Sequence, residues 1–198
     1  LASGLLGFFI PILWLFFNQL INQRLSSEDM LKGLTAMPIL GRISQHKSKD
    51  NVIVQAGGRS AINEMFRQLR TNLHYQSLGQ QQQVLAVTSY GSGEGKSFIA
   101  LNLALTYTLS KKKVVLLELD LRRPMLRRYL NREDTGLGIT NVLVGENTVA
   151  EVTQHYAGLD YICGGPIPPN PWEIVGSESM RSILQELKSK YDYIINDN

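Results

Sequence analysis

Cysteine is nearly absent from this chain: Cys163 is the only one among 198 residues. A single thiol excludes an internal disulfide framework and is typical of a reducing compartment. Basic residues are also not concentrated, because the net charge is +3 and no lysine or arginine run approaches a nucleic-acid footprint. Internal repeats are missing as well. We therefore expect one globular domain with appendages, and no nucleic-acid partner.

Charge is missing altogether from residues 1–20, LASGLLGFFIPILWLFFNQL. As a helix this segment is long enough to cross ~30 Å of hydrocarbon, and a mid-run proline such as Pro11 is tolerated in a membrane. A signal peptide is disfavoured because no basic region and no small-residue cleavage site are present. A buried core helix is disfavoured because all faces are apolar. We predict a transmembrane helix over 1–20 and a juxtamembrane connector over 21–55.

Strands alternate with helices in the remainder of the chain, 56–198. Apolar strand-like runs lie at 84–88 and 114–119, with a helical segment from 96 to about 110 between them. This alternation predicts an α/β fold, a mostly parallel sheet flanked by helices. The chain opens on leucine and stops just after the apolar run YDYII. We therefore expect a fragment cut at both ends, with its last domain truncated.

A glycine-rich loop follows the strand at 84–88 and precedes the next helix, in the sequence VLAVTSYGSGEGKS. A helix N-terminus attracts phosphate, and glycines let the preceding backbone wrap around it. Lys96 can reach the β and γ oxygens of a nucleotide, and the Ser97 hydroxyl can bind magnesium. Tyr90 stands where the strict P-loop pattern has glycine. We predict an ATP and Mg²⁺ site of the P-loop NTPase type, made by Gly91, Ser92, Gly93, Glu94, Gly95, Lys96, Ser97 and Phe98.

Acidic residues end two of the apolar strands. Glu118 and Asp120 follow VVLL, two residues apart, and should therefore point to the same side of the strand. Ligands of open α/β sheets lie at the carboxyl ends of the strands, so one acid can hold a metal while the other orients a nucleophile. Alternatively, Asp120 pairs with Arg122 or Arg123. Asp197 has the form of a Walker B acid, although apolar strands also end in aspartates without function.

A predicted helix from 61 to about 75 carries Glu64, Arg67 and Arg70 at successive steps of three residues. This face is either a solvated surface with a modest ion pair, or a subunit interface in which the arginines meet acidic groups of a neighbour.

Taken together, these segments resemble the bacterial tyrosine kinase (BY-kinase) family, in which a cytoplasmic kinase is joined to a Wzc-like polysaccharide chain-length regulator. The family motifs match in order: E-x-x-R-x-x-R by EMFRQLR, Walker A by SYGSGEGKS, Walker A′ by VVLLELDLRR and Walker B by YDYIIND. The proline-rich stretch GGPIPPNPWEIV is also similar to a family segment. The resemblance favours the interface interpretation of the arginine helix.

The resemblance implies an ATP-dependent protein-tyrosine kinase. Lys96 would neutralise phosphate charge, and Ser97 would hold the magnesium. Asp120 and Glu118 would support the metal and the incoming tyrosine hydroxyl, with Asp197 completing the metal's surroundings. The implied acceptors are tyrosines in a C-terminal cluster, phosphorylated by a neighbouring subunit in a ring.

The family also implies a setting: the bacterial inner membrane, with the kinase domain in the cytoplasm. Expected partners are the capsule or exopolysaccharide export and polymerisation machinery and a cognate tyrosine phosphatase. Two residues depart from the pattern: Glu118 replaces an aspartate, and Asn198 stands where serine or threonine is expected. Two alternatives stay open. One is a MinD/ParA-like ATPase switch, which usually has a lysine where Gly91 stands; the other is a nucleotide-sensing scaffold with weak catalysis.

Overall fold

The computed structural model describes residues 11–14, 16–18, 33, 35–45, 50–77 and 84–198. The chain forms two compact units, Leu1–Ile39 and Leu40–Asn198. In the first unit, residues 11–14 and 16–18 are helical. No helix among the described residues is long and apolar enough to cross a membrane. Much of the predicted transmembrane segment, residues 1–10, 15, 19 and 20, lies outside the described residues, so the membrane span stays a prediction.

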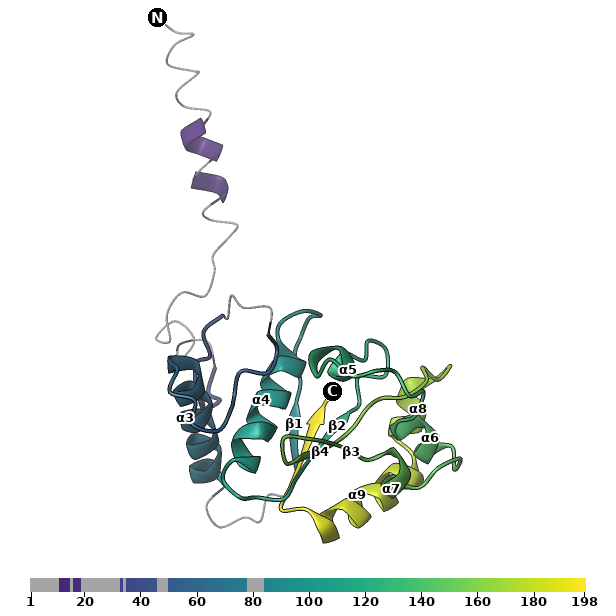
Figure 1. The fold of residues 1–198 in the computed structure, drawn as a ribbon. Helices are drawn as coiled ribbons and strands as arrows, with labels where there is room; N and C mark the ends of the chain where they lie inside the picture. The colour runs from purple at the N-terminus through teal and green to yellow at the C-terminus, as the bar shows by residue number, and fades with distance from the viewer. Residues whose placement is uncertain (1–10, 15, 19–32, 34, 46–49, 78–83) are drawn as a thin grey trace, which may run out of the picture. The chain divides into compact units, whose positions relative to one another are not determined.

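The second unit is built on a five-stranded sheet with the order β1-β5-β2-β4-β3. The first four of these strands run parallel, and β3 is antiparallel to β4. This arrangement confirms the predicted α/β class with a mostly parallel sheet (Figure 1). The strands are β1 (Val84–Val87), β2 (Val114–Glu118), β3 (Gln154–Tyr156), β4 (Leu159–Ile162) and β5 (Tyr193–Asp197).

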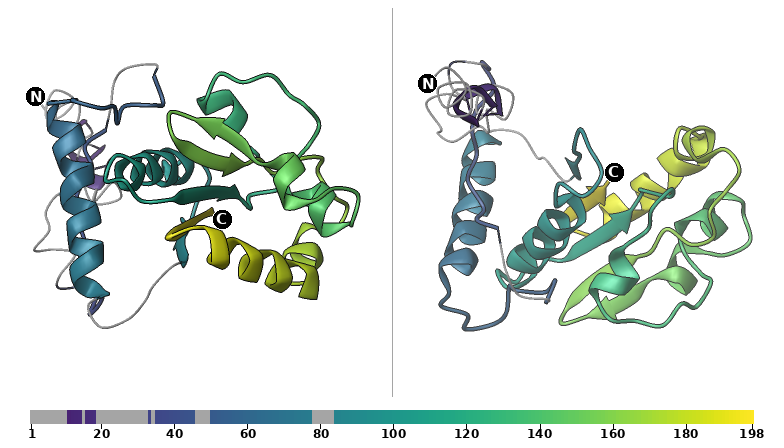
Figure 2. Two further views of the ribbon diagram at one scale, coloured as in Figure 1. Left: turned by 60° about the horizontal axis from the view of Figure 1, so that its bottom comes forward. Right: turned by 90° about the horizontal axis from the view of Figure 1, so that it is seen from above.

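The central strand β2 is buried along its whole length and divides its side chains between two cores. Val114 and Leu116 belong to one core, and Leu117 with Val115 to the other, as expected when side chains alternate across a strand. Helices therefore cover both faces of the sheet, with α4 (Lys96–Thr108) and α9 (Glu178–Lys190) on opposite sides (Figure 2). An apolar run such as VVLL is typical of a parallel strand covered on both faces.

Each face has its own helices. The first core receives side chains from α3 (Ala61–Gln76), α4 (Lys96–Thr108) and α5 (Leu126–Tyr129). The second core receives them from α6 (Ile139–Leu143), α7 (Val149–Val152), α8 (Pro171–Val175) and α9 (Glu178–Lys190). Serine side chains cap the two amphipathic helices α3 and α9, where Ser60 and Ser177 accept the N–H groups of Asn63 and Met180.

A fully buried asparagine fastens an extended segment to the helix that follows the glycine loop. The Asn102 Oδ1 atom accepts the N–H groups of Ile53 at 2.9 Å and Val54 at 3.1 Å. Its Nδ2 atom donates to the carbonyl oxygens of Asn51 and Phe98, both at 2.9 Å. The compact unit thus begins before residue 56 and includes the C-terminal part of the predicted connector.

The contacts of Asn102 predict a large cost of removing its side chain. Asn102→Ala would leave buried backbone groups of residues 51–54 without partners, and we expect a loss of roughly 2–4 kcal/mol in the free energy of unfolding. Asn72→Ala is the control and should cost about 1 kcal/mol. Within the described ranges, the Asn72 side chain makes one hydrogen bond, to the Leu40 carbonyl oxygen at 2.7 Å. Urea unfolding measures both, and equal losses would contradict the account.

Candidate functional site

The glycine loop joins β1 to α4 and needs glycine at two positions. Gly93 has a φ of +85° and Gly95 a φ of +95°, which is left-handed backbone that side chains rarely allow. Gly95 is the N-cap of α4, so Lys96 is the first residue of the helix. The N-terminal amides of α4 and the loop backbone therefore form the type of site that binds phosphate. Tyr90, at the loop's outer edge, is fully exposed.

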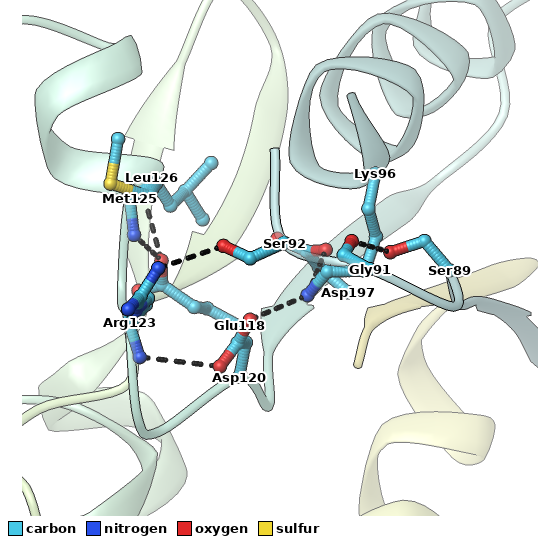
Figure 3. A network of polar contacts seen from close by, with 10 residues as sticks. All are labelled: Ser89, Gly91, Ser92, Lys96, Glu118, Asp120, Arg123, Met125, Leu126 and Asp197. Atoms are coloured by element: carbon cyan, nitrogen blue, oxygen red, sulfur yellow. Dashed lines mark hydrogen bonds and ion pairs between the residues drawn. The ribbon is translucent and has the colours of Figure 1, made fainter. Parts of the chain in front are cut away.

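Lys96 lies between two carboxylates that come from different strands (Figure 3). Its Nζ atom is 2.9 Å from Oδ2 of Asp120, just beyond β2, and 3.1 Å from Oδ1 of Asp197, at the end of β5. Asp197 is 2 % exposed, whereas the Asp120 side chain is partly open to solvent. The structure thus brings together three residues that the sequence placed in one site.

These contacts determine the charge states of the group. Partial burial disfavours the charged form of Lys96, but Asp120 and Asp197 outweigh it and raise the pKa of Lys96 above its ordinary value. Burial also opposes the charged form of Asp120, but the hydrogen bond from Lys96 outweighs it and lowers the pKa of Asp120. Near neutral pH, Lys96 is a cation and Asp120 an anion.

Backbone hydrogen bonds hold these strand ends in register. The N–H groups of Leu119 and Asp120 both donate to the Asp197 carbonyl oxygen, at 2.8 and 3.0 Å. The N–H of Asn198 donates to the Val87 carbonyl oxygen at 3.0 Å. The ends of β1, β5 and β2 therefore meet beside the glycine loop, as expected for the carboxyl edge of a parallel sheet.

Glu118 uses its carboxylate differently from Asp120. It is 1 % exposed, and its Oε1 atom accepts the N–H groups of Met125 and Leu126, the latter at 2.7 Å. Its Oε2 atom accepts the N–H of Gly164 at 2.8 Å. Burial raises the pKa of Glu118, although the three N–H groups partly offset that effect. The two acids were expected to face the same side of a strand, but β2 ends at Glu118 and Asp120 lies beyond it.

The segment after β2 also contacts the glycine loop directly. The Asp120 Oδ1 atom accepts the backbone N–H of Arg123 at 3.2 Å. The Arg123 guanidinium donates to the Ser92 hydroxyl at 2.9 Å. Asp120 is therefore an ion-pair partner of Lys96, and the Arg123 side chain extends to the loop instead. No spacing rule predicts the Arg123–Ser92 contact, because it depends on how closely two separate loops approach.

A cavity of about 720 Å³ opens at this edge, within the size range of nucleotide and cofactor pockets. The glycine loop and residues 119–123 line it. Tyr129, Pro171 and Val175 also line it. Pro171 and Val175 belong to the proline-rich stretch GGPIPPNPWEIV. The resemblance matched this stretch to a family segment but did not place it at the nucleotide site. That match was the signal that could have identified these two residues.

The residues present suit a magnesium ion held together with phosphates. The buried Oδ1 atom of Asp197 has the Lys96 ammonium at 3.1 Å and no further hydrogen-bond donor in the described part of the chain. Asp120 and Ser97 line the cavity, and Asp120 shares the Lys96 ammonium with Asp197. No group of three or more His, Cys, Asp or Glu side chains forms a metal cage among the described residues. Mg²⁺ needs no such cage, because it is usually bound through one or two carboxylates, waters and substrate phosphates.

The predicted interface residues lie on α3, away from the residues that line this cavity. Arg67 contacts Glu64 at 2.8 Å and donates to the Gly58 carbonyl oxygen at 2.7 Å. Arg70 donates to the Thr106 carbonyl oxygen at 3.3 Å. The modest surface ion pair that the sequence allowed is present, and both guanidinium groups also contact backbone.

Comparisons with known proteins agree on one group, although no family model matches the sequence. The tyrosine-protein kinase YwqD of Bacillus subtilis is 36 % identical over 149 residues, which cover 74 % of this chain and 62 % of that protein. The crystal structure of the chimerical protein CapA2B2 has a TM-score of 0.79 at 29 % identity, covering 86 % of this chain and 74 % of the other.

The kinase domain of the Escherichia coli tyrosine kinase ETK has a TM-score of 0.77 at 26 % identity, covering 86 % of this chain and 71 % of that one. The chain spans 62 % of the length of its Bacillus subtilis relative, so it matches part of that protein. Sequence motifs, fold and relatives point the same way. The chain belongs to the Wzc-like family of bacterial tyrosine kinases.

Proposed function

We propose that this chain is the catalytic part of an ATP- and Mg²⁺-dependent protein-tyrosine kinase, which phosphorylates tyrosines near the C-terminus of neighbouring subunits and acts in capsule or exopolysaccharide biosynthesis and export. One observation supports this most strongly: Lys96, at the start of the helix after the glycine loop, lies between Asp120 and Asp197. A cation and two acids beside a phosphate-binding loop are what phosphoryl transfer needs.

In this proposal the nucleotide phosphates occupy the loop from Gly91 to Phe98, with Ser97, Asp120 and Asp197 around the magnesium. Bound ATP and Mg²⁺ supply the transferable phosphoryl group and the charge that neutralises it. Asp120 and Asp197, on either side of Lys96, would supply the carboxylate oxygens for the metal.

Each side chain has a distinct task. Lys96 brings a permanent positive charge to the phosphates, since its raised pKa keeps it protonated. Asp120 is ionised and partly exposed, so it can accept a hydrogen bond from an incoming tyrosine hydroxyl and orient it. Tyr129, Pro171 and Val175 would give the bound nucleotide apolar contacts in the same cavity.

The proposal also covers the rest of the chain. Residues 1–20 form a transmembrane helix in the bacterial inner membrane, and 21–55 a juxtamembrane connector. Residues 56–198 form the cytoplasmic kinase domain, and the C-terminal part of the connector packs against it through Asn102. Glu64, Arg67 and Arg70 form an interface between subunits of a ring. The partners are further copies of the chain, the polysaccharide export and polymerisation machinery, and a cognate tyrosine phosphatase.

Removing the cation at the loop tests the proposed activity. We expect Lys96→Met to lower phosphotyrosine formation by the full-length protein at least ~100-fold, because a phosphate-stabilising charge is lost. The matched control is Lys112→Met, an exposed lysine in the connection between α4 and β2, which should retain activity. Radiolabelled ATP with phosphoamino-acid analysis measures both. ATP hydrolysis without phosphotyrosine would indicate the ATPase switch instead, and binding without turnover the scaffold.

The paired charges predict how stability depends on pH. Asp120 has an ordinary pKa of 3.8 that is lowered in the folded protein, so its contribution is complete above that value and is lost as the pH falls through the folded pKa. The difference in unfolding free energy between the wild type and Asp120→Asn should therefore be present near neutral pH and shrink toward about pH 3. Urea titrations at both pH values measure it, with Glu133→Gln as an exposed control. A difference that grows on acidification would contradict this assignment.

Charge reversal tests the proposed interface. We expect Arg67→Glu combined with Arg70→Glu to convert oligomers of the full-length protein into monomers, because acidic partner groups would then be repelled. Arg181→Glu, on the exposed face of α9, is the control. Sedimentation velocity in detergent measures the outcome, and circular dichroism checks that the fold persists. Unchanged oligomers would place the interface elsewhere.

A further inference from the structure

We propose that Glu118 is a positioning residue, which fixes the loop carrying Asp120 and binds neither metal nor substrate. The activity part of this inference rests on the proposed kinase function, whereas its structural part does not. The aspartate that the family pattern expects here would act as an acid of the site itself. The contacts in this chain assign the glutamate another task.

The first argument is how completely the Glu118 carboxylate is occupied. Three backbone N–H groups donate to it, from Met125, Leu126 and Gly164 (Figure 3 draws the first two). A carboxylate has about four acceptor positions, so little capacity remains for a metal. With 1 % of its surface exposed, the side chain has no open side for a cation with its waters. Burying such a charge is tolerable because the amides solvate it.

The second argument is the location of the donors. Met125 and Leu126 lie at the start of α5, and Gly164 lies just beyond β4. Glu118 itself ends β2. One side chain therefore joins three segments, and the two carboxylate oxygens serve different ones. An aspartate would withdraw the carboxylate by about 1.5 Å, one carbon–carbon bond, which takes hydrogen bonds of normal length out of range.

The third argument concerns the loop between Glu118 and the Met125 and Leu126 amides that it binds. Residues 119–124 form the loop that carries Asp120 and Arg123. Its start is held by the N–H groups of Leu119 and Asp120 on the Asp197 carbonyl oxygen. Its far end is held by Glu118 through Met125 and Leu126. Asp120 therefore meets Lys96 from a loop that is fixed at both ends, and loosening the far end should disturb that meeting.

The two possible roles of Glu118 predict opposite changes in kinase activity for Glu118→Asp. If Glu118 served the metal as an imperfect aspartate, Glu118→Asp would restore the family acid and raise activity. As a positioning residue, Glu118→Asp should lower kcat by roughly 10- to 100-fold, because Asp120 is misplaced, and should leave the Mg²⁺ concentration for half-maximal activity unchanged. Glu133→Asp is the matched control, since it removes the same methylene from an exposed glutamate.

A second readout does not depend on kinase activity. Hydrogen exchange followed by mass spectrometry on the nucleotide-free, full-length protein should show faster exchange at the amides of 125, 126 and 164 in Glu118→Asp. We expect roughly tenfold or more at these amides, since charge-assisted hydrogen bonds are lost, and no change in the peptide that contains Lys96. Should Glu118→Asp fail to fold, Glu118→Gln replaces it, because it keeps the shape and loses part of the accepting capacity.

The outcomes separate cleanly. Faster exchange at the three amides with lower kcat supports the positioning role. Unchanged exchange, or a rise in activity with a lower Mg²⁺ requirement in Glu118→Asp, overturns it. If the wild type forms no phosphotyrosine, the kinase proposal fails, and the exchange experiment still decides the role of Glu118.

Discussion

The site depends on a single electrostatic arrangement, the ammonium group of Lys96 between the carboxylates of Asp120 and Asp197. Lys96 begins α4, Asp120 follows β2 and Asp197 ends β5. The arrangement therefore exists only when these three elements are packed together. The sheet order, with β5 between β1 and β2, places the three ends side by side. The fold therefore serves the site by bringing separate segments to one edge.

Buried charge at this edge has to be solvated by protein groups, and the chain does so in two ways. Asp197 pairs with Lys96, whereas Glu118 accepts three backbone N–H groups. An ion pair can exchange its partner for a phosphate or a metal when a ligand arrives. A carboxylate that amides hold in place is more suited to keeping a loop rigid. The two buried acids are chemically alike, and their surroundings give them different tasks.

The sequence predicted the local parts of this structure well. The strand, glycine loop and helix around Lys96 depend on neighbouring residues, and they formed as predicted. The position of Asp120 beside the glycine loop followed from a general rule on parallel sheets, and that of Asp197 was implied by the resemblance to the family. The direction of the Glu118 side chain was not predictable, because it is decided by amides 7, 8 and 46 residues away in the chain. The role of Asn102 was hidden for the same reason: two of its main partners lie 48 and 49 residues away.

A crystal structure with a non-hydrolysable ATP analogue and Mg²⁺ tests the central claim most directly. The account predicts phosphates in the loop from Gly91 to Ser97, with Lys96 Nζ on a phosphate oxygen. Asp120 and Asp197 should lie beside the magnesium, and Glu118 should still accept the amides of Met125, Leu126 and Gly164. A nucleotide bound elsewhere, or a magnesium whose protein neighbours exclude both aspartates, would contradict it.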